Sequence, residues 1–211
     1  MPKDTFYNLP EEKVKRIEKA AILEFKEYSF DASSINRIVD SSGISKGSFY
    51  QYFEDKKDLY KHIINCIVER KLDYMSDIMK NPFSYDFFTL IREMYKSGLN
   101  FARENPELLE IGNKLIADPS HMIYKEIIQE NKVKSDEVFE LLLQKAMERG
   151  EIRKDIDIKM ISFLLTTLNI SIVDYYFLIT DKREYNEEML EIIEKFLEFV
   201  QYGISPKGEL K

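Results

Sequence analysis

Residues 33–57 read SSINRIVDSSGISKGSFYQYFEDKK, and this stretch decides the fold. Ile35, Ile38 and Val39 recur at the spacing of one helix face, directly after serines that can cap a helix N-terminus. Gly43 then stands where the end of a helix favours a residue that adopts positive φ. The pattern therefore predicts a short helix that ends in a tight turn at Gly43.

A second short helix is predicted directly after this turn. Ser45 can cap it, and Phe49 and Phe53, four residues apart, would lie on its inner face. Two capped helices joined by a glycine-containing turn match a helix-turn-helix, here about residues 34–53, whose second helix enters the major groove of DNA. The positions that this arrangement leaves for outside contacts are Lys46, Ser48, Tyr50, Gln51 and Tyr52.

The run from Gly43 to Phe53, followed by Lys56-Lys57-Asp58-Leu59, resembles the signature of TetR (tetracycline-repressor-like) transcriptional regulators. That family reads approximately G-[VI]-S-K-G-[ST]-[LF]-Y-x-[HY]-F, then K-x-x-L. The resemblance covers about residues 11–71 and continues beyond them only as a layout of helices. It implies an all-α fold with an N-terminal three-helix DNA-binding domain at 11–71 and a larger helical ligand-binding and dimerisation domain at 72–205.

Carried over by position, the resemblance implies a set of DNA contacts. Serine hydroxyls at helix N-termini meet phosphates, the outward positions of the second helix face base edges, and a glycine between them allows close approach of the backbone. An amide at Asn36, where the family often has arginine, favours adenine over guanine. The alternative is that the tyrosines only pack and the serines are only solvated. The candidates are Ser33, Ser34, Asn36, Ser45, Lys46, Gly47, Ser48, Tyr50, Gln51, Tyr52 and Lys56.

The charge of the chain limits how it can bind DNA. The sequence has 31 basic and 38 acidic residues, a net charge of −7, whereas a strong non-specific DNA binder shows a clustered positive patch. From Ser41 to Phe53, however, there is one lysine and no acid. We therefore expect contacts confined to the two recognition elements of a dimer, and binding that weakens steeply with salt.

Helical periodicity extends through the rest of the chain, with breaks at Asn81-Pro82, Asn105-Pro106, Asp118-Pro119 and Gly150. Residues 132–135 are expected to interrupt the long seventh segment. The predicted helices are 11–28, 34–41, 45–52, 56–79, 84–104, 106–116, 120–149, 157–180 and 186–202.

The last two helices are predicted to pair two copies of the chain. Residues 187–201 carry an apolar arc of about 180°, wider than the ~100° that one packing partner needs. Residues 161–179 are nearly continuously apolar but hold too many polar positions for a membrane span. The resemblance implies a four-helix homodimer interface and hence a near-palindromic double-stranded DNA operator. The interface candidates are Leu168, Ile172, Ile193, Phe196, Leu197 and Val200.

A ligand pocket is predicted among the middle helices, which are rich in aromatic residues and methionine. Aromatic residues at helical spacing can equally be core, so polar groups in apolar surroundings are better indicators. The effector is unknown and expected to be apolar or amphipathic; by analogy with the family, it would re-space the two recognition helices. The candidates are Phe88, Tyr95, Asn113, His121, Phe163, Thr167 and Asp174.

Other functions find little support in the sequence. It contains no nucleophile elbow, Walker loop or dinucleotide fingerprint, so an enzyme is not expected. His62, His121 and Cys66 are not taken as a metal site, no cofactor is expected, and Cys66 is interpreted as a buried small hydrophobe. The N-terminus lacks the apolar core of a secretory signal, so a cytoplasmic protein is expected. A repressor is favoured, and a helical protein-interaction scaffold without DNA binding is the alternative.

Overall fold

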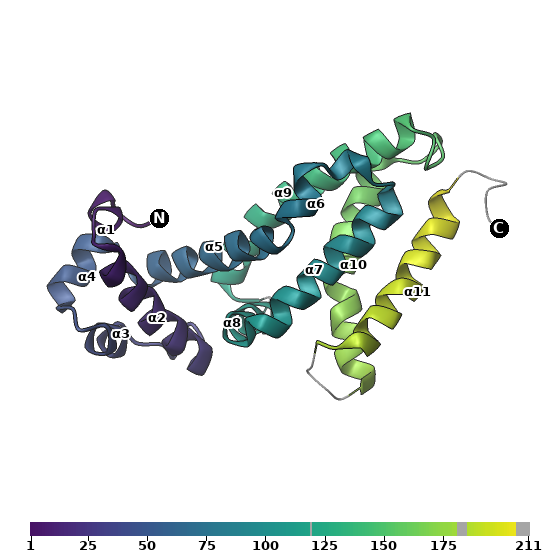
Figure 1. Cartoon of the computed structure of the whole chain (residues 1–211). Coiled ribbons are helices and arrows are strands. Elements are labelled where there is room, and N and C mark those ends of the chain that lie inside the picture. The colour runs from purple at the N-terminus through teal and green to yellow at the C-terminus, as the bar shows by residue number, and fades with distance from the viewer. Residues whose placement is uncertain (119, 181–184, 206–211) are drawn as a thin grey trace. The chain divides into compact units, whose positions relative to one another are not determined.

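The computed structural model describes residues 1–118, 120–180 and 185–205, without the side chains of residues 129, 130, 169, 170 and 174. All regular structure in these residues is helical, as the sequence predicted (Figure 1). The helices are α1 (Asp4–Tyr7), α2 (Glu11–Glu27), α3 (Ile35–Ser42), α4 (Lys46–Tyr52), α5 (Lys56–Tyr74), α6 (Ser76–Lys80), the 3-10 helix η1 (Pro82–Ser84), α7 (Phe87–Glu104), α8 (Pro106–Ala117), α9 (Met122–Glu148), α10 (Ile158–Thr180) and α11 (Glu187–Ile204).

Two expectations about helix boundaries were wrong, and one short helix was missed. The segment predicted at 56–79 is two helices, α5 and α6, separated at Met75. The interruption predicted at 132–135 does not occur, because α9 is continuous through these residues. The short helix α1 was not predicted, since four residues are too few to show a period.

The chain divides into two compact units. The first contains Met1–Asp73 and also Glu104–Ile127, whereas the second contains Tyr74–Arg103 and the chain from Ile128 onward. The predicted domains, 11–71 and 72–205, therefore stay a prediction. By their contacts, α8 and the start of α9 belong to the same compact unit as the helix-turn-helix.

The first unit is built around a core of aromatic and aliphatic side chains. Phe25, Phe49 and Phe53 are almost fully buried, and α3 packs on α2. Phe6 of α1 packs against the Phe53 ring with centroids 4.8 Å apart. The backbone amide of Lys3 donates to the carbonyl of Tyr52 at 2.8 Å. The N-terminal segment thereby holds α4 in place from outside the three-helix core.

The second unit packs α7, α9, α10 and α11 around one hydrophobic core. Gly150, with φ +76°, makes the turn after α9, at the break that the sequence predicted. Two ion pairs join α7 to the last helix: Arg92 Nε lies 2.8 Å from Glu194 Oε2, and a guanidinium nitrogen of Arg103 lies 2.8 Å from Glu187 Oε1. α10 and α11 lie side by side (Figure 1).

These last two helices leave much apolar surface uncovered. By length and composition α10 is apolar enough to cross a membrane, and 20% of its most apolar window is buried. One such helix is weak evidence for a membrane span, since the core helix of a soluble protein passes the same test. Leu178 is 81% exposed and Phe199 is 75% exposed. The large exposed apolar residues here are Met160, Phe163, Leu164, Tyr175, Leu178, Ile179, Phe199 and Tyr202.

Of the six residues predicted for the dimer interface, two are buried and four are half-buried in this unit. Ile193 and Leu197 are buried in the core of their own unit. Ile172, Phe196 and Val200 are half-buried against that core, and Leu168 is also half-buried. Ile193 and Leu197 were therefore wrongly predicted as interface residues, because they belong to the core. The apolar arc of α11 includes both core positions and exposed positions such as Phe199, and helical periodicity alone does not distinguish them.

Candidate nucleic-acid interface

The turn between α3 and α4 has the geometry that the sequence indicated. Gly43 adopts the left-handed conformation, with φ 64° and ψ 34°. The amide of Gly43 donates to the carbonyl of Asp40 at 3.3 Å, and the amide of Ile44 donates to the carbonyl of Val39 at 3.1 Å. These bonds satisfy carbonyls at the end of α3, and three residues connect it to the next helix, α4 (Lys46–Tyr52).

α4 begins with a serine cap and a glycine that the fold does not need. Ser45 Oγ accepts from the amide of Ser48 at 3.0 Å and lies 2.9 Å from Ser48 Oγ. A Cβ added at Gly47 would meet only Ser45 Oγ, at an ordinary 3.7 Å. The described fold therefore gives no steric reason for a glycine at position 47, and close approach of the DNA backbone there stays a prediction.

The second helix presents one face to solvent and buries the other. Lys46, Gln51 and Tyr50 are exposed, and the Tyr50 ring, 43% exposed, stands edge-on to Phe49 at 5.2 Å. The expectation that Tyr52 is available for outside contacts was wrong. It is buried beside Phe53, and its hydroxyl accepts from Lys13 Nζ at 3.0 Å. Positions 49, 52 and 53 share the inner face, since side chains three and four apart lie together on a helix.

Two other candidates are used within the fold. Lys56 Nζ donates to the carbonyls of Phe30 (2.6 Å), Asp31 (3.2 Å) and Ser33 (2.8 Å), and burial lowers its pKa. Ser33 is buried, and its Oγ donates to the carbonyl of Phe30 at 2.6 Å. Lys56 and Ser33 therefore shape the loop before α3 rather than projecting from it. Ser34 is half-buried, and only Asn36 of the α3 candidates is exposed.

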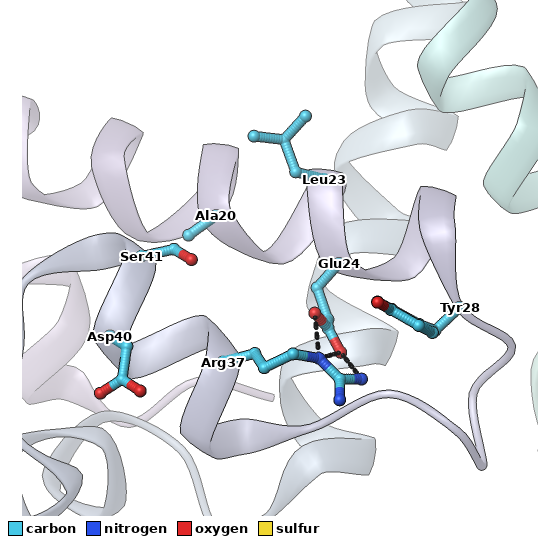
Figure 2. A pocket seen from close by; sticks show the side chains of 7 residues that line it. All are labelled: Ala20, Leu23, Glu24, Tyr28, Arg37, Asp40 and Ser41. Atoms are coloured by element: carbon cyan, nitrogen blue, oxygen red, sulfur yellow. Dashed lines mark hydrogen bonds and ion pairs between the residues drawn. The ribbon is translucent and has the colours of Figure 1, made fainter.

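An ion pair that the sequence interpretation missed fixes α3 against α2 (Figure 2). Glu24 is only 7% exposed, and its carboxylate accepts from Arg37 Nε at 3.0 Å and from an Arg37 terminal nitrogen at 2.5 Å. It also accepts from the amide of Ser34 at 2.7 Å. The Arg37 guanidinium lies 4.0 Å from the Tyr28 ring centroid. An acid on the apolar face of α2, beside Ala20 and Ala21, was the available signal.

The seven ligand candidates do not lie in one unit. Asn113 and His121 belong to the first unit, and His121 Nε2 lies 3.2 Å from Asp31 Oδ1. The other five belong to the second unit. Phe88 is buried there in the core. Tyr95 is half-buried there, and burial raises the pKa of its hydroxyl.

Two of these candidates contact the same lysine. Lys132 Nζ donates to Thr167 Oγ1 at 3.3 Å and lies 3.9 Å from the ring centroid of Phe163, which is exposed. The side chain of Asp174 lies outside the described residues. The ligand site therefore stays a prediction.

Comparisons with known proteins agree with this geometry. Residues 17–63 match the family model for bacterial regulatory proteins of the tetR family. The crystal structure of a TetR family transcriptional regulator from Chloroflexus aurantiacus is 27% identical, with a TM-score of 0.67 over 98% of this chain and 100% of that one.

Two curated relatives are also transcriptional regulators. The HTH-type transcriptional repressor AcnR of Corynebacterium glutamicum is 20% identical over 153 residues, which are 68% of this chain and 71% of AcnR. The HTH-type transcriptional regulator YezE of Bacillus subtilis is 26% identical over 159 residues, 72% of this chain and 79% of YezE.

A capped helix-turn-helix with an outward-facing second helix, on an all-helical chain, defines a helix-turn-helix DNA-binding protein. The family-model match, together with similarity to a solved TetR regulator along nearly the whole chain, confirms the resemblance recognised in residues 43–59. Residues 17–63 therefore form a tetR-type DNA-binding domain, and the chain is similar to a TetR family regulator along nearly its whole length.

Proposed function

We propose that this protein is a cytoplasmic transcriptional repressor that binds a near-palindromic operator as a homodimer and is released by a small effector. The observation that carries the proposal is α4, on which Lys46, Tyr50 and Gln51 face outward while Phe49, Tyr52 and Phe53 are anchored in the core. A short helix held this rigidly can place three polar side chains against base edges and phosphates.

The proposal is tested by a fluorescence-anisotropy titration of the full chain against DNA from just upstream of its own gene, across a salt series. We expect tight binding that is lost on scrambled DNA and weakens steeply with salt, because lysine–phosphate contacts release counterions. Binding no better than to scrambled DNA, repeated after selection from randomised sequences, would favour the alternative of a helical interaction scaffold.

Gly47→Ala separates a DNA contact from a structural role. The added methyl group meets no clash within the protein. We expect the free energy of unfolding to rise by about 0.5 kcal/mol, because alanine favours helix. Operator binding should weaken about tenfold, since the methyl group fills space that the DNA backbone needs. Chemical denaturation and anisotropy measure the two effects.

The matched control for this change is Gly112→Ala in α8, where an added Cβ meets nothing within 4 Å. It should stabilise the fold in the same way and leave DNA binding unchanged. Operator affinity that is unaffected by Gly47→Ala would remove Gly47 from the interface.

We assign the homodimer contact to the exposed apolar surface of α10 and α11. Tyr175, Leu178 and Phe199 are large exposed apolar side chains on two neighbouring helices, and such exposed apolar surface is typical of protein interfaces. A twofold dimer would hold two copies of α4 about 34–36 Å apart, one helical turn of DNA. The two half-sites of the operator follow from this symmetry.

Phe199→Glu tests the interface, because it places a charge on the surface that the partner copy would bury. We expect light scattering after size-exclusion chromatography to give a dimer for the wild type and a monomer for the variant at micromolar concentration. Phe83→Glu is the control, since Phe83 is exposed on η1, outside α10 and α11. A monomeric wild type would contradict the proposal.

Contacts within the first unit suggest how an effector signal reaches α4. Glu126 of α9 pairs with Lys61 at 2.8 Å and with Lys57 at 3.4 Å on α5. His121 pairs with Asp31 before α3, and Lys26 of α2 pairs with Glu107 of α8 at 3.1 Å. An effector that moves α8 or α9 would therefore move the DNA-binding helices, so a compound that stabilises the fold should also release operator DNA in the same titration.

A further inference from the structure

Three potential metal ligands from two helices converge in the first unit. Glu18 comes from α2, and His62 and Cys66 come from successive turns of α5; their ligand atoms all lie within 4.8 Å of one another. His62 Nε2 is 2.8 Å from Glu18 Oε1, and Cys66 Sγ is 3.6 Å from His62 Nε2 and 3.9 Å from Glu18 Oε1. Sequence spacing gave no metal site because Glu18 lies 44 residues from His62.

These separations are close to those of a tetrahedral site. Ligand bonds of about 2.0–2.3 Å place the donor atoms around a Zn²⁺ ion about 3.5 Å apart. The two distances from the Cys66 sulfur already agree with this value to within about 0.4 Å. The Glu18–His62 distance is that of a hydrogen bond and would widen by about 0.6 Å when a cation replaces the shared proton.

The surroundings favour a cation and hold the histidine in place. The His62 ring is buried and contacts the rings of Phe6 and Phe53, with centroids 5.2 and 6.2 Å away. Glu18 and Cys66 are half-buried, which leaves a path from solvent. The carboxylates of Glu18 and Glu69 both act electrostatically on the Cys66 sulfur. The same two carboxylates make the local potential attractive to a cation.

We propose that Glu18, His62 and Cys66 bind one thiophilic divalent cation of the Zn²⁺ type per chain, with water as the fourth ligand. A thiolate, an imidazole and a carboxylate together select such ions over Mg²⁺ or Ca²⁺, which prefer oxygen ligands. The cation would join α2 to α5 and so stiffen the DNA-binding unit. In the alternative, the Glu18–His62 hydrogen bond alone joins these helices and Cys66 is only a small apolar side chain.

The test uses the full chain, reduced and stripped of metal, titrated with Co²⁺ in the absence of DNA. We expect one Co²⁺ per chain, a thiolate-to-cobalt charge-transfer band, and displacement by Zn²⁺. Cys66→Ser should abolish the band and weaken binding at least about 100-fold. His121→Gln removes the other histidine of the chain and should change neither the band nor the affinity.

Stability supplies a second readout. Excess Zn²⁺ should raise the midpoint of thermal unfolding by about 5 °C in the wild type and leave Glu18→Gln unchanged. If Cys66→Ser does not fold, the Co²⁺ titration is made with Glu18→Gln, because glutamine has nearly the same shape as glutamate. A titration without a charge-transfer band, or equal Co²⁺ affinity in the wild type and Glu18→Gln, would overturn the proposal. Neither result depends on whether the protein binds an operator.

Discussion

Replacing Lys46 and Tyr50 together by alanine should lower operator affinity about 1000-fold while the fold and the dimer persist. Both side chains are exposed on α4, and neither contributes to the buried core. Each lost contact to phosphate or base is worth about 1 kcal/mol, and a dimer loses two contacts at each of two half-sites, or about 4 kcal/mol. Anisotropy titration at fixed salt measures the loss.

The control for this change is Tyr124→Ala with Lys125→Ala, which removes the same two side-chain types from α9, outside the helix-turn-helix. Circular dichroism and light scattering should show the same helix content and the same mass for both double variants. Unchanged operator binding after loss of Lys46 and Tyr50 would refute the assignment of α4 as the recognition helix, and the scaffold alternative would then explain the protein better.

Arg37→Ala should destabilise the first unit by about 2–3 kcal/mol. Glu24 is buried, and without Arg37 its carboxylate keeps only the Ser34 amide among the partners described here. Removing one member of a buried ion pair costs about 3–5 kcal/mol, and the partial exposure of Arg37 reduces this cost. Urea denaturation followed by circular dichroism gives the free energy of unfolding.

Two further variants decide whether the effect of Arg37→Ala comes from the ion pair. Arg16→Ala removes an exposed arginine of α2 and should change stability by less than about 0.5 kcal/mol. Glu24→Gln with Arg37→Ala leaves no buried charge, so this double variant should be more stable than Arg37→Ala alone. If all these variants were equally stable, the pair would contribute nothing to the position of α3.

Local patterns in the chain were enough to predict the helix-turn-helix. The serine before α4, the glycine after α3 and the apolar residues three and four apart each act over a few residues, so they identify helix ends without knowledge of the remaining fold. The same local information predicted helices ending near Pro106 and Gly150. It did not separate α5 from α6, because no proline or glycine marks Met75.

The direction of individual side chains depended on contacts between distant residues. Lys56 was predicted to contact DNA, yet its ammonium group donates to carbonyls 23–26 residues earlier in the chain. A half-buried lysine takes hydrogen-bond partners wherever the fold supplies them, and no local pattern encodes their position. No local pattern predicted the ion pair of Glu24 with Arg37 either. Nor did one predict that the Ile193 side chain packs inside its own unit.

By itself, the sequence determined the all-α class, the helix-turn-helix and the resemblance of this segment to tetR-type domains, since these follow from short-range periodicity, caps and one contiguous motif. Only the tertiary structure decided that Tyr52 is core and Tyr50 is surface, and that Glu18 meets His62 and Cys66. The physical reason is that burial and ligand geometry are set by packing between helices. Residues 44 positions apart, such as Glu18 and His62, become neighbours only when α2 packs beside α5.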